Sequence, residues 1–151
     1  MYPFSYAYPL GFREPPASPD ARLAADVAKA IDGEYSAIVC YAELAKLAPH
    51  DAQRTRILEI RRDEERHYQT LSRLYHSLTG SMHSPKLTET CPSEYIAGLQ
   101  AALIDEQETV DQYHELADRG RTHAVREAFR RAAFDEQNHA VWFLYFYTLN
   151  R

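Results

Sequence analysis

Four long stretches of the sequence carry apolar side chains at helical spacing, and each is interrupted near its middle by an acidic residue. The stretches are rich in Ala, Leu, Glu, Gln and Arg, which favour helices. Helix starts are expected at Pro19, Asp51, Pro92 and Thr122, and helix ends at Pro49, Gly80, Gly120 and close to the last residue. Because each apolar stripe must be buried against others, the pattern predicts an all-α four-helix bundle.

The connections between these stretches differ in length. The turns near Pro49 and Gly120 are short, so each should join an antiparallel hairpin. Residues 81–91 can extend roughly 36–40 Å, close to the length of one helix. We therefore expect two antiparallel hairpins joined by a long crossover, with an up-down-up-down bundle and a slack loop as the alternative.

The acidic interruptions occur at matching heights. Glu34 and Glu64 lie equally far from Pro49 along the chain, and Glu106 and Glu136 are centred beside Gly120. Burying an unpaired carboxylate costs several kcal/mol, so four at one level need a counter-charge. The two halves also match at an offset of 72 residues, which predicts two half-sites related by a pseudo-two-fold axis.

Two of the acidic residues are followed by histidine on the same helix face. The motifs are Glu64 with His67 and Glu136 with His139. Two divalent cations would balance four carboxylates, and mixed carboxylate and imidazole ligation suits iron or manganese, with zinc possible. The predicted metal ligands are Glu34, Glu64, His67, Glu106, Glu136 and His139.

The order Glu, Glu-x-x-His, Glu, Glu-x-x-His resembles the ferritin-like superfamily over residues 20–150, particularly rubrerythrin and bacterioferritin. The resemblance implies a di-iron centre that reacts with oxygen or hydrogen peroxide, as a ferroxidase or peroxide-reducing oxidoreductase. Manganese catalase chemistry is a variant of this expectation. The resemblance also implies terminal ligand roles for the two Glu-x-x-His motifs. The glutamates that correspond to Glu34 and Glu106 are bridging in some members and terminal in others.

The chain departs from that family in ways that matter for activity. It lacks the four cysteines of a rubredoxin module, so electrons would come from an external donor. Leu103 stands where rubrerythrins carry a further carboxylate, which weakens the expectation of rubrerythrin-type peroxidase activity. The alternatives are a non-enzymatic iron-binding or buffering protein and an assembly-associated structural protein.

Four further residues are expected beside the metals. By the same resemblance, Asp63 and Asp135 would each hydrogen-bond a ligand histidine of the opposite half. Tyr41 and Tyr113 lie seven residues after Glu34 and Glu106, where they would bond the ligand carboxylates or relay electrons. Ile38 and Val110, one turn from those glutamates, are predicted to line a small apolar pocket.

The composition of the chain narrows the expected cellular location and binding partners. The net charge of −5 gives no indication of nucleic-acid binding, and no apolar run approaches the ~20 residues of a membrane span. Pro3 and Pro9 interrupt the N-terminus, which lacks the features of a signal peptide. With only Cys40 and Cys91, we expect free thiols and a cytoplasmic location.

The chain divides into a Pro- and Tyr-rich arm at residues 1–17 and a bundle domain at residues 18–151. Residues 140–147 are apolar on every side, which is expected where something covers the outer face of a terminal helix. The arm and a second copy of the chain, in a homodimer, are the two candidates.

Overall fold

The structure is a computed structural model, and it describes residues 19–151. It contains four helices: α1 (Pro19–Leu47), α2 (Asp51–Thr79), α3 (Tyr95–Arg119) and α4 (His123–Asn150). The described residues contain no strand, so the predicted all-α class and helix number are confirmed. The predicted N-terminal arm and Ser18 lie outside the described residues.

Local signals in the sequence account for the end of α2 and the start of α4. Gly80 ends α2 in the left-handed conformation (φ 74°), and its N–H donates to the His76 carbonyl at 2.8 Å. The Thr122 hydroxyl accepts from the Val125 N–H at 3.2 Å and caps α4. α2 begins at Asp51, as expected, whereas α3 begins at Tyr95 rather than near Pro92.

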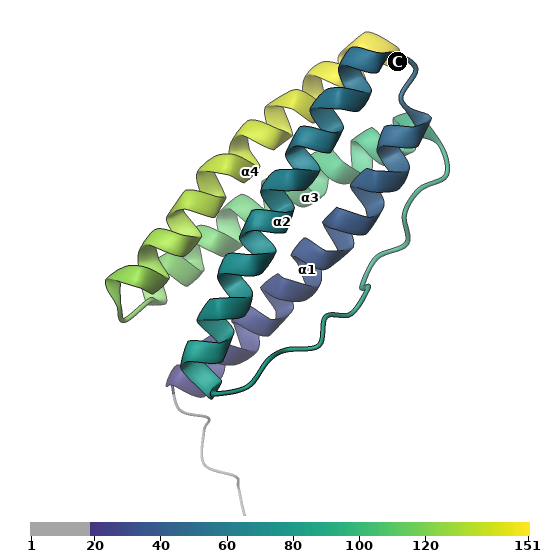
Figure 1. Cartoon of the computed structure of the whole chain (residues 1–151). Coiled ribbons are helices and arrows are strands. Elements are labelled where there is room, and N and C mark those ends of the chain that lie inside the picture. The colour runs from purple at the N-terminus through teal and green to yellow at the C-terminus, as the bar shows by residue number, and fades with distance from the viewer. Residues whose placement is uncertain (1–18) are drawn as a thin grey trace, which may run out of the picture.

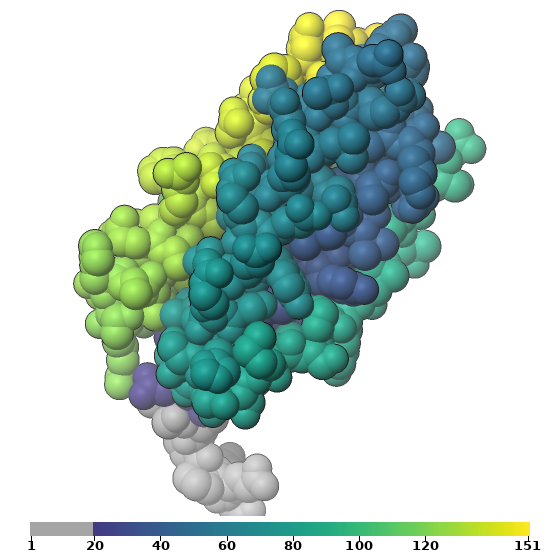
Figure 2. Space-filling model, in the orientation of Figure 1, coloured from purple at the N-terminus to yellow at the C-terminus, as the bar shows by residue number. Residues whose placement is uncertain are grey.

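The helices pair along the chain (Figure 1), with α1 beside α2 and α3 beside α4. Arg61 of α2 donates to the Ile38 carbonyl at 2.9 Å, and Arg54 donates to the Ala45 carbonyl at 3.3 Å. The linker between α2 and α3 runs along the outside of the bundle from one end to the other. In the space-filling view its atoms lie against those of α1 (Figure 2). The linker therefore follows the outer surface of α1, with most of its side chains exposed.

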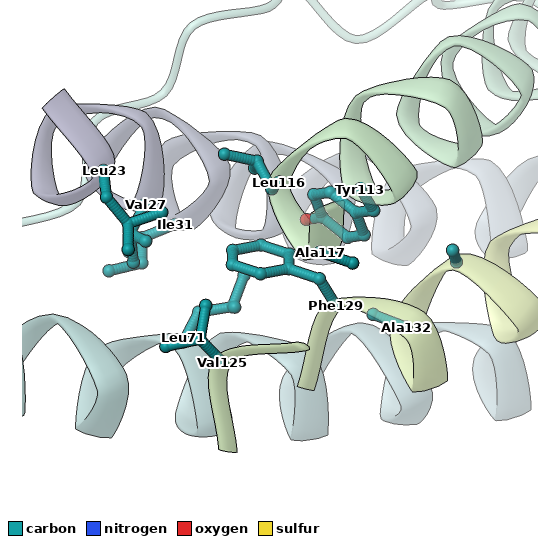
Figure 3. Packing of buried hydrophobic residues seen from close by; sticks show 11 residues of the cluster. Leu23, Val27, Ile31, Leu71, Tyr113, Leu116, Ala117, Val125, Phe129 and Ala132 are labelled. Atoms are coloured by element: carbon teal, nitrogen blue, oxygen red, sulfur yellow. The ribbon is translucent and has the colours of Figure 1, made fainter. Parts of the chain in front are cut away.

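The core consists of two apolar clusters at different heights of the bundle. One surrounds Phe129, whose ring lies among side chains from all four helices, including Ile31 and Leu71 (Figure 3). The other contains Phe143, Leu99 and Ile57, all fully buried. Each fully buried side chain of this kind contributes about 1.5–3 kcal/mol. These two clusters hold the helices together above and below a polar layer.

The cysteines form a disulfide between Cys40 of α1 and Cys91 of the linker, with the Cα atoms 5.0 Å apart. The prediction of free thiols is therefore wrong. The linker's path along α1 brings the two residues together, and spacing in the sequence does not reveal that path. Because disulfides persist mainly in oxidising environments, the expected cytoplasmic location loses the support of free thiols. Among the described residues, no helix is long and apolar enough to cross a membrane.

The outer face of α3 and α4 remains exposed. Val141, Leu144 and Leu149 of α4 are 61%, 47% and 56% exposed, and Ile104 of α3 is 56% exposed. Leu103, Val110, Ala140 and their neighbours line a groove between the two helices. No other described residue covers this face.

Candidate metal centre

All six predicted ligands are buried in the layer between the two apolar clusters. Their exposed fractions do not exceed the 7% of His67, and Glu64, Glu136 and His139 are each 1% exposed. Every helix contributes: α1 supplies Glu34, α2 supplies Glu64 and His67, α3 supplies Glu106, and α4 supplies Glu136 and His139. The structure thus brings residues more than a hundred positions apart into one cluster.

The ligands form two overlapping groups of four, and the candidate ligand atoms within each group lie within 4.8 Å of one another. The first group contains Glu34, Glu64, His67 and Glu136, and the second contains Glu64, Glu106, Glu136 and His139. Glu64 and Glu136 belong to both groups, a geometry suited to bridging. The neighbouring helices α2 and α4 bring the two Glu-x-x-His motifs together, and the terminal role expected for Glu64 and Glu136 stays a prediction. Glu34 and Glu106 each belong to one group.

The imidazole of His67 joins the first group to an aspartate of the opposite half. Its Nδ1 lies 3.0 Å from Glu136 Oε1, 3.4 Å from Glu64 Oε2 and 3.7 Å from Glu34 Oε2. Its Nε2 lies 3.0 Å from Asp135 Oδ2. An Nε2–H donated to Asp135 leaves the Nδ1 lone pair directed at the carboxylate cluster, ready to bind a cation.

His139 repeats this arrangement in the second group. Its Nδ1 lies 2.8 Å from Glu64 Oε1, 3.1 Å from Glu136 Oε2 and 3.5 Å from Glu106 Oε2. Its Nε2 lies 3.0 Å from Asp63 Oδ2. The structure therefore shows that Asp63 and Asp135 each accept a hydrogen bond from the histidine of the opposite half, as expected.

Two buried tyrosines cross between the halves. The Tyr41 hydroxyl donates to Glu106 Oε1 at 2.6 Å, and the Tyr113 hydroxyl donates to Glu34 Oε1. Each tyrosine thus orients the glutamate that belongs to a single group. The hydrogen-bonding role expected for these tyrosines is seen directly, whereas an electron-relay role stays a prediction.

Burial and mutual repulsion make the metal-free carboxylates weak acids. Burial, with the charges of Glu106 and Glu34, raises the pKa of Glu64 to about 8. Burial also raises the pKa of Glu106 well above its ordinary value, with the charge of Glu136 adding to it. Without metal, the cluster therefore retains protons at neutral pH.

The histidines carry the balancing charge in the absence of metal. Burial alone would lower the pKa of His67, but its contacts with Glu136, Glu34 and Glu64 outweigh burial and raise it. The pKa of His139 is raised in the same way, with Asp63 and Glu106 its strongest partners. Divalent cations would replace these protons.

The donor set fits a cation on geometric grounds as well. Glu64 Oε1, Glu136 Oε1 and His67 Nδ1 are buried without a hydrogen-bond partner among the described residues. Glu64 Oε1 and Glu136 Oε1 do lie 2.8 and 3.0 Å from imidazole nitrogens, but not in hydrogen-bonding alignment. Buried polar atoms of this kind are rare in native proteins, and a bound ion is one explanation for them.

A cavity of about 230 Å³ adjoins the ligands between α1 and α3. Glu34, Glu64, Glu106 and Glu136 line it, together with Tyr41, Tyr113 and smaller residues such as Ala37. Ile38 and Val110 do not line it, and Val110 instead lines the groove between α3 and α4. Both are half-buried instead, because the inward face of α1 passes through Ala37 and Tyr41 rather than Ile38.

Two acidic residues beside the cavity were missed by sequence reasoning. Asp105 precedes the ligand Glu106, and Glu89 lies in the linker. Burial, followed by the neighbouring charge of Glu89, raises the pKa of Asp105 to about 8. Their adjacency follows from the path of the linker, for which the sequence gives no periodic signal.

Comparison with known proteins identifies one relative by sequence and one solved structure with a similar fold. No family model matches the chain. The chain is 51% identical over 141 residues to "Uncharacterized protein YhjR" of Bacillus subtilis (strain 168), covering 93% of this chain and 94% of that protein. The structure of the present chain resembles that of "Hypothetical Protein Pfu-1136390-001 From Pyrococcus furiosus", with a TM-score of 0.75 and 19% identity. That match covers 84% of this chain and 89% of the other, and at this identity it shows the fold alone.

Proposed function

The chain belongs to the family of the Bacillus subtilis protein YhjR, and we propose that it is a ferritin-like di-metal carboxylate protein. In this proposal two antiparallel hairpins, joined by the long crossover, hold a pair of iron ions, with manganese or zinc as alternatives. The protein acts on oxygen or hydrogen peroxide as a ferroxidase or peroxide-reducing oxidoreductase. An external donor supplies the electrons.

The observation that carries this proposal is the pair of four-residue groups that share Glu64 and Glu136. Each half-site has one carboxylate of its own and half of each shared carboxylate, so two negative charges face each divalent ion. The carboxylate and imidazole donors suit iron and manganese. Bound iron would supply the redox chemistry that oxygen or peroxide requires.

The protein's own residues prepare the site in three ways. Asp63 and Asp135 accept from the Nε2 atoms of His139 and His67 and keep both Nδ1 atoms directed inward. The tyrosine hydroxyls hold the two unshared glutamates in place. The cavity between α1 and α3 gives a small oxidant room beside the shared carboxylates.

Metal content and turnover test the proposal in sequence. The metal-free protein is loaded with Fe(II) without oxygen, and bound iron is counted. It is then mixed with peroxide in a stopped-flow spectrometer, with and without a reductant. We expect two ions per chain and repeated peroxide turnover when reductant is present.

The test variant is E64Q and its control is E43Q. Both remove one carboxylate, but Glu43 is an exposed residue of α1 paired with Lys46 at 2.7 Å. E43Q should bind two ions, whereas E64Q should lose affinity for both. Two ions bound without repeated turnover would favour the iron-buffering alternative. No metal uptake by the wild-type protein would refute the proposal.

Two further expectations stay proposals. A homodimer would cover the exposed face of α3 and α4. A cytoplasmic location is the second. It is tested by measuring whether the Cys40–Cys91 pair is oxidised in cells, because the cytosol keeps most thiols reduced.

A further inference from the structure

The linker between α2 and α3 is attached at several points to one face of α1. Asp32 and Ser36 lie four residues apart on this face. Asp32 Oδ1 accepts from the Lys86 N–H at 2.8 Å and lies 2.8 Å from His83 Nε2. Ser36, fully buried, accepts from the Thr88 N–H at 3.0 Å. The linker is thus fixed to α1 by side chains that play no part in the metal cluster.

The third attachment is covalent and lies four residues further along α1. Cys40 bonds to Cys91, which places the linker residue Glu89 between the Ser36 and Cys40 attachments. There Glu89 is exposed and faces the half-buried Asp105 of α3. The disulfide therefore fixes the position of a carboxylate that the helices do not supply.

Glu89 and Asp105 line the same cavity as the buried ligands. Exposed Glu108 also lines it, and Lys29 is the only basic residue among the described lining residues. At the inner end, Glu64 and Glu136 are each 1% exposed and carry an Oε1 atom without a hydrogen-bond partner among the described residues. The cavity thus connects an acidic opening to buried oxygen atoms that lack partners.

We propose that Glu89 and Asp105 form the access site through which divalent cations reach the two half-sites, with the Cys40–Cys91 disulfide holding Glu89 in place. The proposal rests on the proposed metal-binding function. The two apolar clusters block the bundle axis on both sides of the ligands. A second cavity, between α2 and α4, reaches His67 but is lined by Arg66 and Arg131, so the cavity between α1 and α3 is the acidic approach. Negative charge lining a cleft raises the local cation concentration and the association rate.

The test measures the rate of Co(II) uptake by the metal-free full-length protein, using stopped-flow visible absorbance. E89Q should slow uptake roughly tenfold at low salt. The number of ions bound should remain two, because Glu89 is not a ligand. Added salt should reduce the difference between E89Q and wild type, since salt screens exposed charges. E43Q removes the same charge away from the cavity and should match the wild-type rate.

The double variant C40S/C91S tests the role of the disulfide. It should slow uptake to a similar degree as E89Q, and adding E89Q to it should slow uptake little further. If E89Q and E43Q take up Co(II) at the same rate, the access site is refuted even though the metal centre stands. If the wild-type protein binds no Co(II), the metal centre itself is refuted, and the access site with it.

Discussion

Raising the pH from 5 to 7 is expected to destabilise the metal-free protein, which is the reverse of the usual behaviour of a paired carboxylate. The pKa of Glu64 rises from 4.5 to about 8 on folding. Above pH 4.5 the unfolded chain loses the Glu64 proton while the folded protein retains it. The folded state therefore binds more protons, and the free energy of unfolding falls until about pH 8.

The size of the effect follows from the shift. One group contributes about 1.4 kcal/mol per pH unit, so Glu64 alone lowers stability by about 2.7 kcal/mol between pH 5 and pH 7. The raised pKa values of His67 and His139 act in the same direction above pH 6.5. The lowered pKa of Asp63 acts below this window, so it does not oppose the trend. In a domain of this size the melting temperature falls by roughly 5–10 °C.

The assay is thermal unfolding of chelator-treated protein, followed by far-UV circular dichroism at pH 5, 6 and 7. E64Q should show a weaker pH dependence, because glutamine does not titrate. Saturation with divalent metal should reverse the trend, since metal binding releases protons and strengthens as pH rises. Metal-free stability that is constant or increases from pH 5 to pH 7 would refute the electrostatic description of the cluster.

Three further predictions test the geometry in other ways. In an equilibrium titration, E34Q should reduce the number of bound Co(II) ions from two to one, whereas E64Q should lower the affinity for both ions. If the two variants lose the same amount of Co(II) binding, the shared role of Glu64 is contradicted. D135N should lower the affinity for one ion roughly 10–100-fold while the helical content stays unchanged, and unaltered affinity would leave the His67 contact without a function. V141D should convert a homodimer, of about twice 17.4 kDa by light scattering, into a monomer, and an unchanged mass would exclude this face as the interface.

The candidate ligands were predictable because helical geometry is local. Glu64 and His67 share a helix face whatever surrounds them, and residues equally far from a tight turn lie at equal heights. The helix ends at Gly80 and Thr122 also follow from nearby residues. These features depend on backbone geometry over a few turns, so periodicity and spacing in the sequence are enough to find them.

The functional detail was less accessible. Which glutamates are shared depends on how far each helix is rotated about its axis, and Ile38 shows the error that arises when the inward face is assigned from spacing alone. The apolar stripe is wide enough to accept either Ala37 or Ile38 as an inward residue. Only packing against neighbouring helices decides between them.

The sequence by itself determined four helices with buried acid and histidine at one level. The tertiary structure alone decided that Glu64 and Glu136 lie in both half-sites and that the linker follows α1 to bond Cys91 to Cys40. An irregular linker has no period, so its path is set by contacts with distant residues such as Asp32 and Ser36. For the same reason, the acidic opening at Glu89 and Asp105 exists only in the folded protein.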